Sequence, residues 1–222
     1  MNYGKEFEKY AMSDHNVSSL NMHYHKQQLE NSMTPYILEE REMRVTQMDI
    51  FSRLMADRLL WVAGPVNDQM STIVQAQLMF LSNTAHDDIT MHIDSPGGSV
   101  KSGLSMVDVM DYIPCDIRTV NTGMAASMGS VLLGAGKKGK RSSLRHSTTM
   151  LHQSSGGFSG NIQDAKVDWA EWQKVNEELF ILLGSYCGKT AEQVKNDATR
   201  DFWLNAEEAK KYGIIDEIIK PK

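Results

Sequence analysis

Cysteine and long apolar runs are both scarce in this sequence, and each absence excludes a class of protein. The 222 residues include two cysteines, Cys115 and Cys187, and neither has the spacing of a metal site. A disulfide scaffold is thereby excluded, and we expect a cytoplasmic protein from a reducing compartment. No apolar run approaches the roughly 20 residues needed to cross a bilayer. The first eight residues also lack the charged start and apolar block of a secretory signal.

The charge and the motif content argue against further classes. The formal net charge is −5, which disfavours nucleic acid and anionic membranes as partners. No G-x-x-x-x-G-K-[ST] motif is present, so we expect no nucleotide site in this chain. His23 and His25, with His15 nearby, could bind a metal, but acidic and cysteine partners are missing there. We therefore expect no metal site.

The chain divides into a polar start and one domain. Residues 1–33 have little aliphatic content and no sustained period, which predicts a flexible N-terminal segment or propeptide. Ordered structure is expected from Thr34, and residues 34–222 contain no internal repeat and no linker. The charged stretch 39–44 is interpreted as an exposed loop, and residues 50–55 as a short amphipathic helix.

From residue 58 onward, predicted strands alternate with predicted helices. Strands are expected at 58–63, 88–94, 117–121 and 148–152, with helices at 68–82, 99–112 and 130–136 between them. The first of these helices should bury Met70, Ile73, Val74, Leu78 and Leu81. The basic cluster 137–141 is most simply a solvated turn. This alternation predicts an α/β fold with a largely parallel sheet.

The last third of the chain begins with a glycine-rich stretch, 154–160, and continues into a long predicted helix, 161–186. Trp169, Trp172, Leu179 and Leu183 form an apolar stripe along that helix. The helix either projects to pack on another subunit or folds back on its own domain, and the sequence favours neither. Capping boxes then predict short helices after Thr190 and Asn205, and a last strand is expected within 213–219.

Ser127 is the candidate nucleophile. It stands between Ala126 and Met128 at a strand-to-helix turn, where a hydroxyl is presented beside backbone N–H groups that can stabilise an oxyanion. Taken alone, such a serine is more often a small residue at a close helix contact. In parallel sheets, however, active sites lie at the carboxyl ends of strands, and Gly97, Gly98, Ser127 and His152 all follow predicted strand ends.

Several motifs together resemble the ClpP family, the proteolytic subunit of ATP-dependent Clp protease. The similarity extends from about residue 35 to the C-terminus. The motifs that carry it, in chain order, are Phe51-Ser52-Arg53-Leu54, Ser95-Pro96-Gly97-Gly98-Ser99, Ala125-Ala126-Ser127-Met128-Gly129, Leu151-His152-Gln153, Thr199-Arg200-Asp201-Phe202 and the stretch from Ala206 to Asp216.

This resemblance implies a crotonase-like fold and a serine endopeptidase. Ser127 would be the nucleophile, His152 the general base and Asp201 the group that orients His152, in agreement with what these residue types permit. Asp197 competes with Asp201 for the third role, but only Asp201 stands in the family's Arg-Asp-Phe context. The oxyanion hole would use the N–H groups of Gly98 and Met128, with glycine at 98 allowing close approach of the substrate carbonyl.

The resemblance also implies an assembly. Two rings of seven subunits would form a tetradecamer joined by the long helix, and unfolded substrate would bind along Gly97, Gly156 and Gly157. Residues 37–47 would line an axial pore. An AAA+ Clp ATPase would unfold the substrate, so ATP is used by that partner and this chain needs no cofactor. The surface of this chain that docks the ATPase would include Phe80, Thr90, His92, Tyr112 and Thr122. It is more polar than is usual in the family at Thr90, His92 and Thr122, whereas Phe80 and Tyr112 retain ring character.

Some positions depart from the family pattern, and two alternatives stay open. Ser154 stands where proline is common, and Met124 where glutamine is common. Part of residues 1–33 should be removed in the mature protein. The alternatives are a catalytically silent ClpP-like ring subunit and, with less support, a crotonase-fold acyl-CoA hydratase.

Overall fold

The computed structural model describes residues 36–41, 44–156 and 161–221, and the chain divides into two units, Met1–Arg53 and Leu54–Lys222. In the first unit, strands β1 (Tyr36–Arg41) and β2 (Arg44–Asp49) form an antiparallel hairpin. The prediction of an exposed loop at 39–44 is therefore wrong, because backbone pairing organises this charged stretch on both sides of the turn. The flexible segment predicted for 1–33 lies outside the described residues, and the predicted domain boundary stays a prediction.

Helix α3 (Ile50–Ala56) follows the hairpin, as expected for residues 50–55. The Asp49 carboxylate accepts hydrogen bonds from the N–H groups of Phe51 and Ser52, each at 3.0 Å. These two bonds satisfy amides of the first turn. A hydrogen bond from the Ser52 hydroxyl contributes most to lowering the pKa of Asp49, and the two backbone bonds add to it. The helix thus begins at a capped N-terminus.

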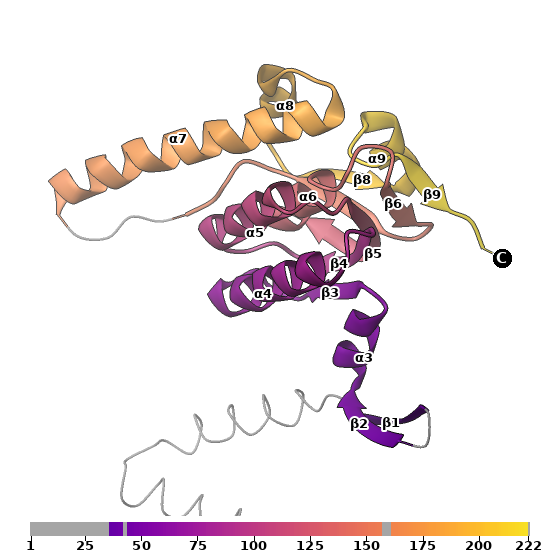
Figure 1. Ribbon diagram of the computed structural model, residues 1–222. Helices are drawn as coiled ribbons and strands as arrows, with labels where there is room; N and C mark the ends of the chain where they lie inside the picture. The colour runs from indigo at the N-terminus through magenta and orange to yellow at the C-terminus, as the bar shows by residue number, and fades with distance from the viewer. Residues whose placement is uncertain (1–35, 42–43, 157–160, 222) are drawn as a thin grey trace, which may run out of the picture. The chain divides into compact units, whose positions relative to one another are not determined.

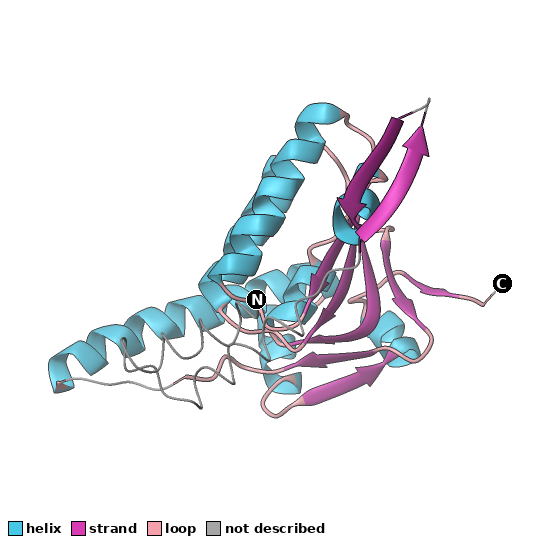
Figure 2. Ribbon diagram, turned by 90° about the horizontal axis from the view of Figure 1, so that it is seen from below, coloured by secondary structure: helices cyan, strands magenta, loops and turns pink. Residues whose placement is uncertain are grey.

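The second unit is built on a mostly parallel sheet, which confirms the predicted α/β class (Figures 1 and 2). Five parallel strands lie side by side in the order β3 (Leu59–Ala63), β4 (Ile89–Ser95), β5 (Ile117–Ala126), β6 (Arg141–Leu144) and β9 (Glu217–Ile219). The sequence interpretation missed β6 and ended β5 too early, at residue 121.

The length of β5 lets it pair with two different strands in succession. Residues 119–121 pair with β6, and residues 124–126 pair with β7 (Thr148–Leu151), again in parallel. The antiparallel strand β8 (Phe202–Asn205) completes the sheet beside β7. The second half of β5 therefore carries its end away from β6 and toward β7.

Helices α4 (Asp68–Thr84), α5 (Val100–Tyr112) and α6 (Met128–Gly134) supply one side of the core. Ile89, Met91 and Ile93 are fully buried, while Thr90 and His92 alternate to the other face, as the period of two predicted. In α4, Leu78 and Leu81 are buried as expected, but Ile73 is 49% exposed, so its assignment to the core is wrong. Asn67 and Ser99 cap the first two helices.

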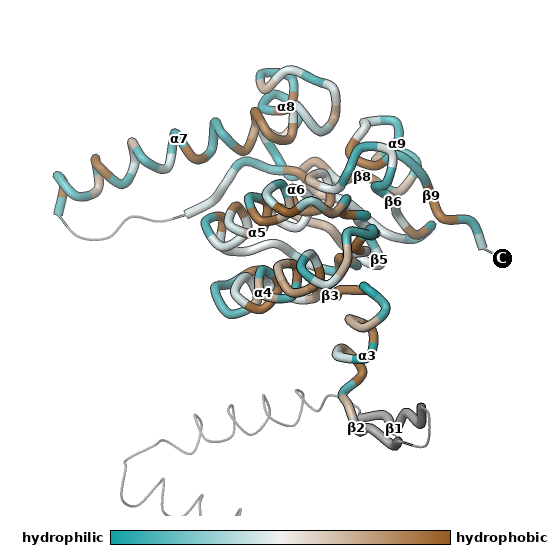
Figure 3. Tube along the Cα trace, viewed as in Figure 1, coloured by the Kyte–Doolittle hydropathy of each residue, from teal (hydrophilic) through white to brown (hydrophobic). Residues whose placement is uncertain are grey.

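Helix α7 (Ile162–Cys187) has two different halves. All of its buried residues lie between Leu179 and Gly184, whereas Trp169, in the first half, is 46% exposed. That first half extends beyond the sheet and alternates between hydrophilic and hydrophobic residues (Figures 1 and 3). The apolar stripe predicted along the whole helix therefore reaches the core only in its second half.

The C-terminal region contains α8 (Ala191–Asp197) and α9 (Ala206–Tyr212), and both predicted capping boxes are present, at Thr190 and Asn205. In each box the side chain of the capping residue accepts from the third backbone N–H of the helix, and that third side chain accepts from the capping backbone. In the part of the chain that the structure describes, no helix has the length and hydropathy needed to cross a bilayer.

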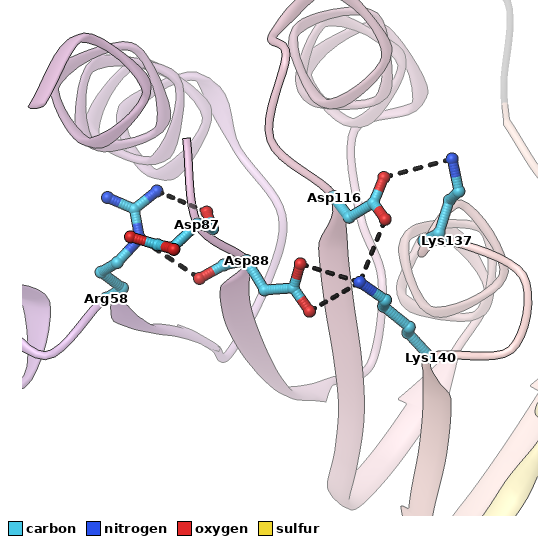
Figure 4. A network of polar contacts seen from close by, with 6 residues as sticks. All are labelled: Arg58, Asp87, Asp88, Asp116, Lys137 and Lys140. Carbon is cyan, nitrogen blue, oxygen red and sulfur yellow. Dashed lines mark hydrogen bonds and ion pairs between the residues drawn. The ribbon is translucent and has the colours of Figure 1, made fainter. Parts of the chain in front are cut away.

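The basic cluster after α6 is not simply a solvated turn. Arg141 is 2% exposed and forms a bidentate ion pair with Asp216, with additional hydrogen bonds to the carbonyls of Tyr186 and Gly213. Burial by itself would raise the pKa of Asp216, but hydrogen bonds from Arg141 outweigh it and hold that pKa below its usual value. Lys140 joins a second network, at the amino ends of the strands (Figure 4).

Candidate active site

Strand register brings the three predicted catalytic residues to one edge of the sheet. Ala126 pairs with Met150, so the end of β5 lies beside the end of β7, and Ser127 and His152 both lie just beyond these strands. The backbone N–H of Ser127 then donates to the Met150 carbonyl at 2.9 Å. The parallel pairing of β5 with β7, which the sequence did not predict, therefore sets the distance between Ser127 and His152.

The antiparallel strand β8 delivers the carboxylate. Leu151 pairs with Phe202, so the residue after Leu151 and the residue before Phe202 are neighbours. These residues are His152 and Asp201. Because β7 and β8 run in opposite directions, the end of one strand and the beginning of the other meet at the same edge.

The two contacts within this group are unequal. Nε2 of His152 lies 2.8 Å from Oγ of Ser127, a normal hydrogen-bond distance. Nδ1 of His152 lies 3.4 Å from Oδ1 of Asp201, whose side chain is 60% exposed against 22% for His152. The competing carboxylate, Asp197, accepts a hydrogen bond from the Tyr212 hydroxyl at 2.9 Å. Asp201 is thus the carboxylate beside His152.

The backbone at Ser127 is strained, a feature that the sequence did not indicate. Its φ is 52° and its ψ is −123°, a conformation that non-glycine residues rarely adopt. Its carbonyl accepts from both the N–H and the hydroxyl of Ser130, at 2.9 and 2.6 Å. Although Ser127 precedes α6, its hydroxyl makes no capping bond to the helix, so it remains available to His152.

Gly97 packs behind this turn. It has a φ of +89°, and a Cβ added there would lie 2.6 Å from the Ser127 Cβ and 2.7 Å from the Ala126 carbonyl oxygen. Its own carbonyl accepts from the Val66 N–H at 2.8 Å. Gly97 is buried, so the structure places this predicted substrate-binding residue as a support of Ser127.

Gly98 is exposed, and the reason for glycine there differs from the one argued from sequence. A Cβ at this position would lie 2.2 Å from the Val66 carbonyl oxygen, so the isolated bridge between these two residues leaves no room for a side chain. From the sequence, the space left by the missing side chain at Gly98 was expected to admit the substrate carbonyl. Close packing of Gly98 on Val66 is sufficient to require glycine.

A small pocket opens beside Ser127, with Gly98 and Met128 on its border. Met128 is the first residue of α6, so its N–H has no acceptor within the helix. The remaining wall has an apolar part from α5, α6 and α7 and a polar part from Ser130 and the arm after β7. Its residues are Val100, Ser130, Val131, His152, Ser154, Ser155, Leu179 and Leu183. Such a pocket can take an apolar side chain of a substrate next to the place where the N–H groups of Gly98 and Met128 could donate to a substrate oxygen.

A larger groove of about 910 Å³ begins on the other side of His152 and Asp201. The arm 152–156 forms one wall, α7 another, and the segment from α8 to Asp201 the third. Gly156 lines this groove, whereas Gly157 lies outside the described residues. Trp169 and Trp172 also line it, with ring centroids 5.2 Å apart. Their helical spacing was predicted from the sequence, but their position beside the site was not.

The five predicted docking residues fall into two groups. Thr90, His92 and Thr122 lie on the sheet face opposite the buried side chains of β4, and His92 stacks on Trp61 of β3 with centroids 4.7 Å apart. Desolvation lowers the pKa of His92. Phe80 and Tyr112 are 58% and 77% exposed, on α4 and α5. Within one chain these two groups do not share a face, and Trp61 is a neighbour of the first that sequence reasoning missed.

Metal ligands do not gather anywhere in the described part of the chain, where no group of three or more His, Cys, Asp or Glu side chains could hold an ion. His15, His23 and His25 lie outside the described residues. Cys187 is partly buried, and burial raises the pKa of its thiol to about 12. Cys187 is therefore not an activated thiolate that would compete with Ser127 as a nucleophile.

Known proteins resemble this chain over almost all of its length. Residues 40–222 match the family model described as Clp protease. A protein of Porphyromonas gingivalis named ATP-dependent Clp protease proteolytic subunit is 43% identical over 216 residues, 97% of each chain. Proteins of the same name from Bacteroides fragilis and Bacteroides thetaiotaomicron are 47% and 46% identical over 191 residues, covering 86% of this chain and 92% and 87% of their own. With this agreement of sequence and fold, the chain belongs to the Clp protease family.

Proposed function

We propose that this chain is the proteolytic subunit of an ATP-dependent Clp protease, a serine endopeptidase that cleaves unfolded polypeptides into short peptides. One observation carries the proposal: Nε2 of His152 lies 2.8 Å from the hydroxyl of Ser127. Ser127 stands on a strained turn, and its hydroxyl makes no capping bond to α6. The names of the relatives support the proposal. They do not favour the acyl-CoA hydratase or the silent subunit.

The proposed reaction follows from these contacts. His152 takes the Ser127 proton as Oγ attacks the scissile carbonyl, and the resulting oxyanion accepts hydrogen bonds from the N–H groups of Gly98 and Met128. His152 then gives its proton to the leaving amine. Water, deprotonated by His152, releases the acyl group in the second half of the cycle. Asp201 holds the proton of Nδ1 and so favours the tautomer in which Nε2 accepts.

The walls of the site indicate how a peptide would bind. The small pocket beside Ser127, whose apolar wall is formed by Val100, Val131, Leu179 and Leu183, would hold a substrate side chain next to the cleaved bond. The extended arm around Gly156 and Gly157 would pair with the peptide backbone as an added strand, with Gly97 supporting the site from below. Strand pairing reads backbone rather than sequence, which suits an enzyme that digests many unfolded proteins.

The assembly that we propose has two rings of seven copies, joined by α7, in the cytoplasm. The exposed first half of α7 supports a contact with another copy. The two groups of docking residues lie on different faces of one chain, so a docking site for the AAA+ ATPase would be shared by neighbouring copies. Residues 37–47 would line the axial pore, ATP would be used by the partner alone, and part of residues 1–33 would be removed.

Degradation of an unfolded protein tests the proposal. Fluorescently labelled casein should be degraded with ATP when a Clp ATPase is added, and a short fluorogenic peptide should be cleaved without it. The Ser127→Ala variant, assembled to the same mass, should do neither. Equal cleavage by the variant would contradict the proposal.

A further inference from the structure

The arm that leaves β7 is attached to the rest of the molecule at two consecutive residues. Residues 152–156 have no strand partner. The Gln153 N–H donates to the Ala198 carbonyl at 3.3 Å, on the segment that leads to Asp201. The next residue, Ser154, is attached to α7 instead. The position of the backbone just after His152 therefore depends on both segments.

The attachment to α7 is made by a single acceptor. The backbone N–H and the hydroxyl of Ser154 both donate to Oδ1 of Asn176, each at 2.9 Å. Only the oxygen of an asparagine amide can accept from a backbone N–H, so the side chain of Asn176 has one usable orientation. We call this pair of bonds the Ser154–Asn176 clip. Both residues are half-buried, which protects the bonds from competing water.

His152 needs such support because its contact with Asp201 is weak. The distance between Nδ1 and Oδ1 is 3.4 Å, beyond the usual range for a hydrogen bond, and the Asp201 side chain is 60% exposed. An exposed carboxylate at this distance holds the imidazole only loosely. The orientation of the imidazole then depends strongly on the backbone of His152, which β7 fixes on one side and the clip fixes two residues later.

We infer that Asn176 is a positioning residue for the reaction, acting through Ser154 on His152; this inference rests on the proposed function. The same face of α7 carries Leu179 and Leu183, which line the pocket beside Ser127. One helix face thus sets both the pocket and the arm that carries the base. A proline at 154, the residue that is common at this position in the family, has no N–H and could not form the clip. It would restrict the arm through its ring instead.

Three variants of the full chain test the inference. In Asn176→Ala the clip is lost, and we expect kcat for a fluorogenic peptide and the rate of Ser127 acylation by a fluorophosphonate to fall about tenfold, with KM within about twofold. Asn176→Asp keeps an acceptor oxygen and should restore most of both rates. Glu178→Ala, two residues later on α7, is the matched control and should behave as the wild type, because Glu178 is exposed and lies outside the groove.

Two further measurements keep the outcomes separate. Ser154→Pro in the Asn176→Ala background should recover much of kcat, since the ring replaces the clip. Hydrogen exchange at the Ser154 amide should speed up in Asn176→Ala, a readout that needs no active serine. Equal kcat and acylation in Asn176→Ala and Glu178→Ala, at equal melting temperature and mass, would overturn the inference. A wild-type chain without acylation at Ser127 would instead overturn the proposed function, and the positioning role with it.

Discussion

The two ends of the parallel strands differ in composition: charged residues stand at the amino ends, and glycines and small residues at the carboxyl ends. At the amino ends, each of β3, β4, β5 and β6 is directly preceded by a charged residue, in order Arg58, Asp88, Asp116 and Lys140. The Lys140 ammonium lies 2.7 and 2.8 Å from the two oxygens of Asp88 and 3.0 Å from Asp116, and Lys137 adds a second contact to Asp116 (Figure 4). At the carboxyl ends, glycines and small residues surround Ser127.

Backbone strain occurs at both ends, and the difference lies in what the strained side chain does. Arg58 and Ser127 are the non-glycine residues with positive φ in the described ranges, at 62° and 52°. The Arg58 guanidinium donates to four carbonyls in the last turn of α4 and the loop after it, including Leu81 at 3.0 Å and Asp87 at 2.7 Å. The Ser127 hydroxyl instead faces His152. A strained residue whose side chain is hydrogen-bonded to the backbone, such as Arg58, stabilises the fold. A strained residue whose hydroxyl faces a histidine, such as Ser127, is a candidate catalytic residue.

The largest expected effect is a loss of catalysis from a substitution at the carboxyl ends of the strands. His152→Ala should lower kcat for peptide cleavage by about 10⁵-fold, because the Ser127 hydroxyl loses its base. The melting temperature should change little, since His152 is not a core residue. Steady-state kinetics and a thermal melt check both. A large loss of stability with modest loss of kcat would mean that this end is structural as well.

Gly97→Ala should damage both stability and activity. The new Cβ would meet the Ser127 Cβ at 2.6 Å, at a φ of +89°. We expect a loss of about 2–4 kcal/mol and at least about a hundredfold in kcat. Gly139→Ala is the control, because Gly139 has the same φ of +89° with nothing within 4 Å of a Cβ. It should cost about 1–2 kcal/mol and leave kcat unchanged.

Asp201→Asn should have an intermediate effect. The 3.4 Å separation and the exposed carboxylate limit how much Asp201 orients His152. We expect kcat to fall about 10- to 100-fold, less than for a tightly bonded aspartate in a serine protease triad. A loss as large as that of His152→Ala, measured with the same peptide, would show that the contact is short in the working enzyme and would weaken the role inferred for Asn176.

The smallest effect belongs to the amino ends. Lys140→Met should lower the melting temperature slightly at low salt, less at 1 M NaCl, and leave kcat unchanged. Hydrogen bonds from Lys140 and then Lys137 hold the pKa of Asp116 below its usual 3.8. A lowered carboxyl pKa stabilises the fold above that value and loses its effect as pH falls through the folded pKa. The difference between wild type and variant should therefore be present at pH 7 and shrink below about pH 4.

Much of the fold could be predicted because local rules determine it. Alternation in Ile89, Met91 and Ile93 gave the buried face of β4, and side-chain capping gave the helix starts at Asn67, Ser99, Thr190 and Asn205. The hairpin 36–49 was missed because its strands are charged and their pairing is not visible in composition. Arg141 was taken as solvated because its partner, Asp216, is 75 residues away in the chain.

The candidate site could likewise be predicted only in part. The residue types and motifs named Ser127, His152 and Asp201, but nothing local indicates that β5 leaves β6 for β7, which is what brings them together. The strained turn at Ser127 packs closely against Gly97, 30 positions earlier in the chain, and the Ser154–Asn176 clip joins residues 22 positions apart. Both depend on tertiary contacts, so no period or propensity could reveal them.

Reaction with a fluorophosphonate probe, followed by mass mapping of the modified residue, tests the central claim most directly. We predict one adduct on Ser127, absent in Ser127→Ala and in His152→Ala. An adduct on another residue, or none on a chain shown to be assembled into rings, would contradict the assignment of Ser127 as an activated nucleophile.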